Sequence, residues 1–282
     1  MSAEVYAIAS GKGGTGKTTV SINLGVSLAG LGTRVIVIDA DIAMPNVGLL
    51  LGEDKINKTY HDYIAGHSSI EEIIYEGPGG LKFIPGSLTL DNIAEIDTTR
   101  VVELIDYLKH RFDFILIDTA PGISRETAVV LESADNTFLV VNPEISSVVD
   151  SLKIKVYVEM KERSIKGIIL NRTNIYQIHS PSEIDESEDE IPDEDIKNIL
   201  ESSIYGRVPE DRIIKKASFQ RVPAVLLEPS ANASVFFKSI ASKIAGYEYD
   251  FEYQQKVSDK SSLLKKIISL FSIRKNKNEN KN

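Results

Sequence analysis

The sequence predicts an α/β protein with a single doubly wound, mainly parallel β-sheet and helices on both of its faces. Short runs of β-branched residues alternate with longer amphipathic stretches through most of the 282 residues. Several short runs are apolar throughout, such as residues 35–38 (VIVI) and 114–117 (FILI), which is typical of strands buried on both faces. Strand–helix alternation of this kind is typical of a parallel sheet covered on both sides.

The individual elements follow from these patterns. The expected strands are Val5–Ala9, Arg34–Asp39, Leu81–Ile84, Phe114–Asp118, Thr137–Asn142, Lys166–Asn171 and Ile204–Val208. The expected helices are Thr18–Leu31, Thr99–His110, Arg125–Glu132, Ser147–Arg163, Asp193–Ser202 and Asn232–Ala245, with Asp193 as the expected N-cap of its helix. Ligands of such sheets bind beyond the carboxyl ends of the strands. Functional side chains are therefore expected in the loops after Ala9, Asp39, Asp118 and Asn171.

Composition and charge exclude several classes of protein. With 42% hydrophobic and 26% charged residues, the chain has an ordinary globular composition, and no run approaches the roughly 18–20 apolar residues of a membrane span. No cysteine is present, which excludes disulfides, iron–sulfur clusters and thiolate zinc sites. The N-terminus lacks the pattern of a secretory signal, so a cytoplasmic location is expected. The four histidines, which show no metal-ligand spacing, are expected to be solvated: His61, His67, His110 and His179.

The net charge of -9 is distributed unevenly. Residues 183–195 contain nine acidic residues and no basic one, which predicts a solvated, mobile loop. Residues 256–282 contain eight basic residues and two acidic ones. Charge asymmetry of this kind indicates local interactions of a loop and a tail rather than a property of the fold.

The segment Gly11–Thr18 (GKGGTGKT) matches the phosphate-loop pattern G-x-x-x-x-G-K-[ST] and lies between a predicted strand and a predicted helix. Glycines let successive backbone N–H groups converge on phosphate oxygens, and the helix N-terminus favours the same anion. Lys17 supplies a positive charge to the β- and γ-phosphates, and the Thr18 hydroxyl can bind Mg²⁺. The sequence therefore predicts a P-loop NTPase that binds a nucleotide and Mg²⁺.

The second lysine, Lys12, is not needed by an ordinary phosphate loop. With it, residues 12–18 (KGGTGKT) resemble the signature of the deviant Walker A ATPases of SIMIBI-type fold, the family that contains MinD and ParA. In that family the early lysine reaches across a dimer interface to the partner's nucleotide. The resemblance implies an ATPase that forms an ATP-dependent homodimer, with Lys12 and Lys17 among its catalytic residues.

The resemblance extends to the loops expected to hold the metal and the attacking water. It implies that Asp39 and Asp118 act on Mg²⁺ together with Thr18, that Asp41 and Asn46 position the water, and that the N–H of Gly122 senses the γ-phosphate. No general-base glutamate stands near Asp118, so hydrolysis is expected to be slow until a partner stimulates it. The sequence departs from many bacterial members at residues 123–125 (ISR).

The base-binding residues are also implied by resemblance. Asn171 and Arg172 match the family's adenine-reading asparagine and stacking arginine, and residues 207–211 (RVPED) resemble its VIPED turn. Residues 142–150 (NPEISSVVD) are close to the MinD form of that segment, whose final aspartate, Asp150, is expected near Lys12. The cofactor-binding set is then Gly11, Lys12, Gly13, Gly14, Thr15, Gly16, Lys17, Thr18, Thr19, Gly122, Asn171, Arg172, Pro209 and Glu210.

The basic C-terminal stretch predicts a membrane-targeting helix. On a helical wheel, six large apolar residues share an arc of about 160°, with lysines beside it. These residues are Leu263, Leu264, Ile267, Ile268, Leu270 and Phe271. One copy should bind an anionic membrane weakly and two copies on a dimer far better. The alternative is that this helix docks on its own domain or on a protein partner.

The predicted organisation is an ATPase domain at 1–246, a linker at 247–260, the amphipathic helix at 261–274 and a polar tail at 275–282. The tyrosines at 247–253 are expected in a packed strand or linker rather than an autophosphorylated tail. The favoured function is that of a MinD-like ATPase that uses ATP and Mg²⁺, binds the cytoplasmic face of the membrane peripherally and positions cell division or another surface structure with a regulator or cargo protein. The competing function is that of a ParA-type partition ATPase that binds DNA non-specifically, which the acidic balance makes the weaker alternative.

Overall fold

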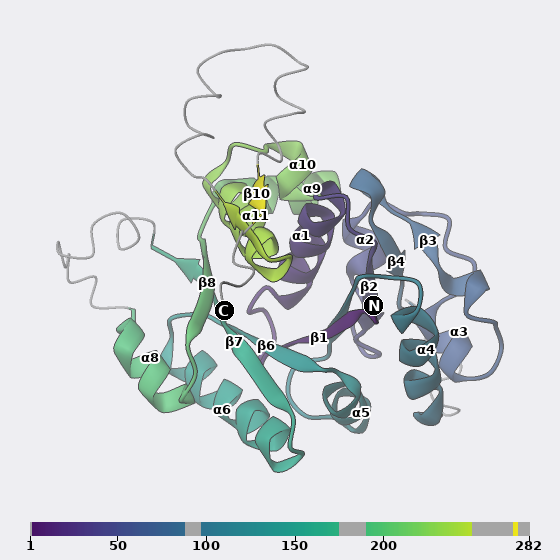
Figure 1. Ribbon diagram of the computed structural model, residues 1–282, viewed down its shortest axis with the longest axis horizontal. Coiled ribbons are helices and arrows are strands. Elements are labelled where there is room, and N and C mark those ends of the chain that lie inside the picture. The colour runs from purple at the N-terminus through teal and green to yellow at the C-terminus, as the bar shows by residue number, and fades with distance from the viewer. Residues whose placement is uncertain (1, 88–96, 175–189, 250–272, 276–282) are drawn as a thin grey trace, which may run out of the picture.

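An eight-stranded sheet in the order β3-β4-β2-β5-β1-β6-β7-β8 forms the centre of the molecule (Figure 1). The structure, a computed structural model, describes residues 2–87, 97–174, 190–249 and 273–275. The strands are β1 Glu4–Ala9, β2 Val35–Ala40, β3 Tyr75–Glu76, β4 Lys82–Ile84, β5 Phe114–Thr119, β6 Asn136–Val141, β7 Ser164–Thr173 and β8 Ile204–Pro209. Only the short β3 runs antiparallel to its neighbour within this sheet, so the predicted fold class is confirmed.

The two faces of the sheet are buried in two separate hydrophobic clusters. In β5, Ile115 and Ile117 belong to one cluster, and Phe114 and Leu116 belong to the other. Successive side chains of a strand point to opposite faces, so a strand covered on both sides must be apolar at every position. This accounts for the unbroken apolar runs of the sequence.

Helices cover both faces (Figure 1). One layer contributes to the cluster that contains Leu116: α1 Lys17–Gly30, α2 Val47–Leu50, α9 Arg212–Gln220, α10 Ala224–Leu227 and α11 Asn232–Ile244. The other layer contributes to the cluster that contains Ile115: α3 Tyr60–Ile64, α4 Thr99–Lys109, α5 Arg125–Ser133, α6 Ile145–Met160 and α8 Asp193–Leu200. Two 3₁₀ turns, η1 Glu71–Ile73 and η2 Pro78–Gly80, complete the described helical segments.

Several elements lie outside the sequence prediction. The short α2, α3, α10 and β3 have too few residues to show a period, and the nine-residue α9, which buries Ile213 and Ala217, was not predicted. The predicted N-cap of α8 is wrong, because Pro192 occupies that position and Asp193 is the first helical residue. The Asp193 carboxylate instead accepts a hydrogen bond from the Arg207 side chain (2.9 Å).

The chain continues as a strand after α11. β9, Tyr247–Tyr249, pairs antiparallel with β10, Ile273–Lys275, so the first tyrosines do lie in a strand. Ile273 and Arg274 are therefore not helical, which corrects the end of the helix predicted at 261–274; residues 261–272 lie outside the described residues, as does most of the acidic stretch 183–195. In the described part of the chain, no helix has the length and apolarity that a membrane crossing requires.

Candidate nucleotide-binding site

The phosphate loop connects β1 to α1 at the carboxyl edge of the sheet, where the sequence predicts it. Gly16 has a φ of 94°, and a Cβ atom there would lie 2.3 Å from Asn171 Nδ2. A Cβ atom on Gly11 would lie 2.0 Å from the backbone carbon of Asp150. Both positions therefore require glycine. Among the described residues no side chain caps the N-terminus of α1, so its first N–H groups are available to bind an anion.

Lys17 is a buried cation in the first turn of α1. Its side chain is only 7% exposed, and its amine makes no hydrogen bond to any residue that the structure describes. Burial lowers the pKa of Lys17, whereas the charges of Asp118 and Asp41 act in the opposite direction. The hydroxyl of Thr15 is likewise buried without a hydrogen-bond partner among the described residues. A buried ammonium and an unsatisfied hydroxyl in the same loop fit a phosphate group.

Asp118 is held at the end of β5 by two hydroxyl groups of α1. Thr18 Oγ1 donates to Asp118 Oδ2 (2.6 Å), and Ser21 Oγ donates to Asp118 Oδ1 (3.0 Å). Burial raises the pKa of Asp118 to about 6. Ser21 was not among the predicted site residues; its signal in the sequence is a hydroxyl one turn after Lys17, between the apolar residues Val20 and Ile22.

Asp39 lies opposite Asp118 in the pairing of β2 with β5. Its carboxylate is fully buried and accepts hydrogen bonds from the N–H groups of Asn46 (2.9 Å), Val47 (2.9 Å) and Asp41 (3.3 Å). Burial and the neighbouring Asp118 raise the pKa of Asp39 well above its usual range. Two adjacent buried carboxylates favour a bound cation, and with the Thr18 hydroxyl they form the hard oxygen set that Mg²⁺ prefers.

The loop after β2 carries the two residues predicted to position water. Asp41 Oδ1 accepts a hydrogen bond from the Met44 N–H (3.0 Å), and Asn46 Nδ2 donates to the Met44 carbonyl oxygen (2.7 Å). The backbone of Asn46 also binds Asp39. Asp39, Asp41 and Asn46 thus belong to one hydrogen-bonded loop at the carboxyl edge of the sheet.

His61 is buried, so the prediction of a solvated side chain is wrong at this position. Its Nδ1 accepts a hydrogen bond from the Ser87 N–H (2.9 Å), and its Nε2 lies 3.0 Å from the Ile42 carbonyl oxygen. Since Nδ1 accepts, Nε2 carries the proton and donates to Ile42. The neutral imidazole therefore ties α3 to the backbone of the loop that carries Asp41. No periodic pattern singles out this contact in the sequence.

Lys12 projects from the phosphate loop toward the start of α6. Its amine donates to Ser146 Oγ (2.9 Å) and Glu144 Oε2 (3.1 Å), and its side chain is 39% exposed. Asp150, expected beside Lys12, pairs through its carboxylate with Lys153 (3.1 Å).

Gly122 lies next to Ser10, the residue that precedes the phosphate loop. Its N–H donates to the Ser10 carbonyl oxygen (3.0 Å). Sensing of a γ-phosphate by this N–H would therefore require the turn after β5 to rearrange.

The predicted base-binding residues meet at the ends of β7 and β8. Asn171 Nδ2 donates to the Thr15 carbonyl oxygen of the phosphate loop (2.7 Å). Arg172 has a φ of 58°, and its Nε lies 3.8 Å from Glu210 Oε2. Pro209 pairs with Thr173 in the sheet register, next to Glu210. The structure thus brings the phosphate-binding and base-binding candidates to one edge.

Known proteins share this sequence and fold. Residues 3–166 match the family model described as an AAA domain. An uncharacterized ATP-binding protein of Methanocaldococcus jannaschii is 37% identical, over 95% of this chain and 96% of its own length. The structure of the septum site-determining protein MinD of Pyrococcus horikoshii, complexed with Mg-ADP, is similar with a TM-score of 0.77 and 33% identity, over 86% of this chain and 96% of that one.

The chain belongs to the MinD branch of the MinD/ParA P-loop ATPases. MinD of Aquifex aeolicus, solved in a complex with MinC, is also similar, with a TM-score of 0.75 and 29% identity over 88% of this chain and 98% of that one. This MinD-branch protein uses ATP and Mg²⁺ as cofactors, in agreement with the buried lysine and the oxygen donors of its site.

Proposed function

We propose that this MinD-branch protein is a slow ATP hydrolase that dimerises with ATP, binds the membrane through its C-terminal helix and positions cell division or another surface structure. The observation that carries the proposal is the outward position of Lys12. This lysine is held by Ser146 and Glu144 at the rim of the site, not inside it with Lys17. A lysine at the rim can reach the nucleotide of a facing copy.

Exposed apolar side chains surround this rim. Ile145, between the two partners of Lys12 in the sequence, is 71% exposed, and Met44 and Ile123 are also exposed. Met44 lies in the loop of Asp41 and Asn46, and Ile123 follows Gly122. Large apolar residues gathered around a polar site are typical of a surface that another molecule covers. A second copy of the chain would bury them together with Lys12.

The proposed hydrolysis divides the site into roles. Lys17 and the N-terminus of α1 hold the phosphates, and Thr18, Asp39 and Asp118 hold Mg²⁺, which would neutralise charge on the transferring phosphate. Asp41 and Asn46 orient the attacking water, while Lys12 of the facing copy adds positive charge. The sequence near Asp118 offers no glutamate base, which supports slow turnover.

Membrane binding is proposed from the amphipathic stretch at 262–272, with one copy too weak to hold alone. Dimerisation would place two amphipathic stretches on one dimer. Once the first stretch is bound to the membrane, the attachment of the second is intramolecular. ATP would therefore control membrane binding without contacting the tail, and release would follow hydrolysis.

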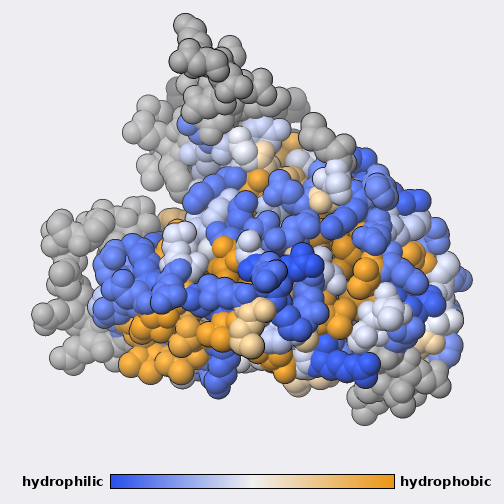
Figure 2. Space-filling view, turned by 60° about the horizontal axis from the view of Figure 1, so that its bottom comes forward, coloured by the Kyte–Doolittle hydropathy of each residue, from blue (hydrophilic) through white to orange (hydrophobic). Residues whose placement is uncertain are grey.

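A protein regulator or cargo completes the proposed cycle. The precedent is the complex of MinC with MinD from Aquifex aeolicus. In this chain, α6 and α8 expose the apolar side chains of Val149, Val156, Met160 and Ile199. Figure 2, which turns the lower side of Figure 1 forward, shows hydrophobic residues gathered on this side of the molecule. A patch of this kind is suited to a protein partner.

The dimer is tested with Lys12→Ala. The native protein should change from monomer to dimer in analytical ultracentrifugation when Mg-ATP replaces Mg-ADP. The variant should bind ATP as a monomer and fail to dimerise. Lys153→Ala, which removes an exposed lysine paired with Asp150 on α6, serves as the control and should still dimerise. A Lys12→Ala protein that keeps both the dimer and normal turnover would contradict the proposed role.

A further inference from the structure

The outer face of α9 combines basic side chains with an exposed aromatic ring. At about 100° per residue, Arg212, Lys215, Lys216 and Phe219 share an arc of about 100°. All four are exposed, and Phe219 is 90% exposed. These four residues are called the α9 face below.

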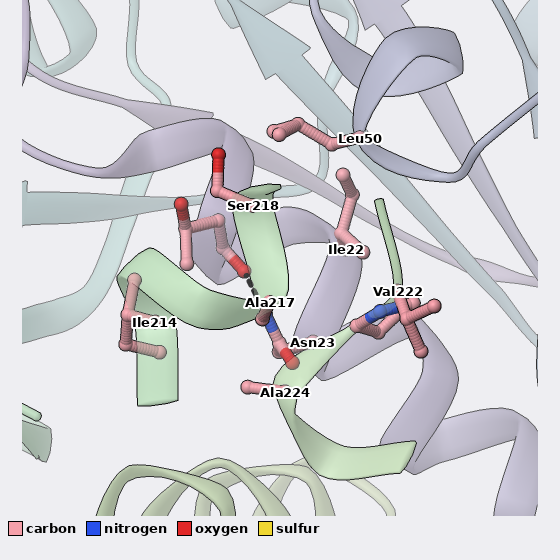
Figure 3. Close-up of a pocket in the computed structure, with 10 residues that line it drawn as sticks. Ile22, Asn23, Leu50, Ile214, Ala217, Ser218, Val222 and Ala224 are labelled. Atoms are coloured by element: carbon pink, nitrogen blue, oxygen red, sulfur yellow. Dashed lines mark hydrogen bonds between the residues drawn. The ribbon is translucent and has the colours of Figure 1, made fainter. Parts of the chain in front are cut away.

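The inner face of α9 fixes this orientation. Ile213 and Ala217 are buried, and Asp211 caps the helix by accepting a hydrogen bond from the Ile213 N–H (3.0 Å). Figure 3 shows Ile214 and Ala217 of α9 beside Ile22 and Asn23 of α1, around a small cavity of about 20 Å³. The apolar residues that hold α9 on the domain are therefore separate from Phe219, which contributes nothing to the core.

The charges of the α9 face are not neutralised by the domain. Residues 212–221 contain four basic residues and no acidic one. Arg221, at the C-terminal end, pairs with Asp54 (2.7 Å). In the described part of the chain, Arg212, Lys215 and Lys216 form no ion pair, although the whole chain is acidic. This face therefore presents concentrated positive charge to an external partner.

We propose that the α9 face binds an anionic lipid surface as a second membrane contact of this protein. Lys and Arg interact with anionic headgroups, and an aromatic side chain between them can enter the interface below the headgroups. Phosphate contacts to duplex DNA would use the charges but give the ring no apolar surroundings. The charge pattern and the exposed ring together favour lipid over DNA.

The location of α9 supports the same occupant. α9 packs on α10, α10 on α11 and α11 on β9, and Figure 1 shows α9, α10, α11 and β10 at one end of the molecule. The predicted lipid-binding stretch lies in the sequence between β9 and β10. This inference rests on the proposed membrane association and adds a site on the folded domain, so that one subunit holds the membrane at two points.

The chain contains no tryptophan, so Phe219→Trp introduces a single fluorescent reporter at an exposed position. With Mg-ATP and vesicles of phosphatidylcholine and phosphatidylglycerol, its emission should shift to shorter wavelength. Phosphatidylcholine vesicles alone and duplex DNA should produce no shift. The same samples are sedimented to measure binding independently.

The charges are tested by replacing Arg212, Lys215 and Lys216 together with Gln. The apparent affinity for phosphatidylglycerol vesicles should fall at least about tenfold, because each basic residue near an anionic leaflet contributes to binding. Replacing Lys55, Arg111 and Arg163 with Gln removes the same charge from other exposed positions and should change the affinity less than about twofold. Unchanged ATP affinity shows that each variant is folded.

The outcomes separate this inference from the proposed function. ATP-dependent sedimentation of Phe219→Trp without an emission shift, or with undiminished affinity of the triple Gln variant, overturns the α9 contact and leaves tail-mediated binding intact. Loss of DNA binding rather than vesicle binding in the triple variant identifies a nucleic-acid surface and also overturns it. A protein that neither sediments nor shifts contradicts both proposals. An emission shift that persists after deletion of residues 261–282 supports the α9 contact and contradicts sole anchoring by the tail.

Discussion

The phosphate end and the base end of the nucleotide site differ in how firmly the protein itself holds the functional groups. At the phosphate end, Asp39 and Asp118 are buried, and each accepts at least two hydrogen bonds from the protein. At the base end, the Arg172 side chain is 52% exposed, and its Nε lies 3.8 Å from Oε2 of its ion-pair partner Glu210. The phosphate end is organised before the nucleotide arrives, whereas Arg172 and Glu210 at the base end are exposed to solvent, although Asn171 beside them is buried.

Because of this difference, the phosphate end should govern the rate of ATP hydrolysis and the base end should govern the affinity for ATP. Preorganised charges in a buried site stabilise the charge that develops during phosphoryl transfer, because little reorganisation is left to do. Solvent screens the exposed groups at the base end, whose contacts with the nucleotide are the same before and during the reaction. Such uniform contacts change binding without changing kcat. Substitutions at the two ends should therefore have different kinetic signatures.

The largest effect is expected from Lys17→Ala at the phosphate end. Removing the buried ammonium should lower kcat about 100- to 1000-fold, the range found when one electrostatic contact to a transition state is lost. Phosphate release at saturating Mg-ATP measures it. Lys215→Ala, which removes an exposed lysine from α9, provides the folded control with normal turnover in solution. A Lys17→Ala protein with near-normal kcat would remove the basis for contrasting the two ends.

A smaller loss is expected when the loop of Asp41 is loosened through His61. His61→Asn can keep an acceptor for the Ser87 N–H but loses the donor to Ile42, so kcat should fall about tenfold, in the range of positioning effects, with KM little changed. His61→Gln can keep the donor to Ile42 and should retain most of kcat. Steady-state ATP hydrolysis by the two variants measures the effect. Equal losses in both would show that His61 supports the fold rather than the loop.

His61 also predicts a pH dependence of stability. Burial lowers the pKa of His61, although the hydrogen bond to Ile42 and the charges of Asp62 and Asp41 oppose this change. The unfolded state therefore takes up the proton first, and the contribution of neutral His61 is complete above about pH 6.5 and declines as the pH falls below it. Thermal unfolding of the native protein and His61→Gln across this range measures the difference. Parallel pH curves for the two proteins would contradict it.

The smallest effect is expected at the base end with Arg172→Ala. Loss of a stacking side chain should weaken ATP binding about threefold to tenfold while kcat stays unchanged. Breaking the exposed pair with Glu210 should change the free energy of unfolding by no more than about 1 kcal/mol. Isothermal titration with ATP and hydrolysis at saturation separate the two quantities. If Arg172→Ala lowered kcat and left ATP binding unchanged, Arg172 would act in the chemical step and not in binding.

The sequence was sufficient to predict features that depend on a periodic pattern or on consecutive residues. All seven predicted strands and six predicted helices are present, because continuous apolar runs and amphipathic periods reflect burial directly. The phosphate loop was predictable because its residues are consecutive, and Asp39 and Asp118 because they end buried strands.

Contacts made by tertiary packing were not predictable. His61 meets Ile42 and Ser87 only after α3 folds against the sheet, and nothing in its sequence neighbourhood indicates that burial. α9 was a miss of another kind, because its nine residues are amphipathic, with Ile213 and Ala217 buried, and the sequence could have shown this. The strand at Ile273 depends on a partner more than twenty residues earlier, which a helical-wheel argument cannot detect.

The most direct test of the account is the sedimentation of the full-length protein with anionic vesicles in Mg-ATP and in Mg-ADP. The account predicts binding in Mg-ATP, little binding in Mg-ADP, and a large loss of binding on deletion of residues 261–282 with nucleotide affinity unchanged. Binding to plain duplex DNA without ATP-dependent binding to vesicles would contradict the account and favour a partition ATPase.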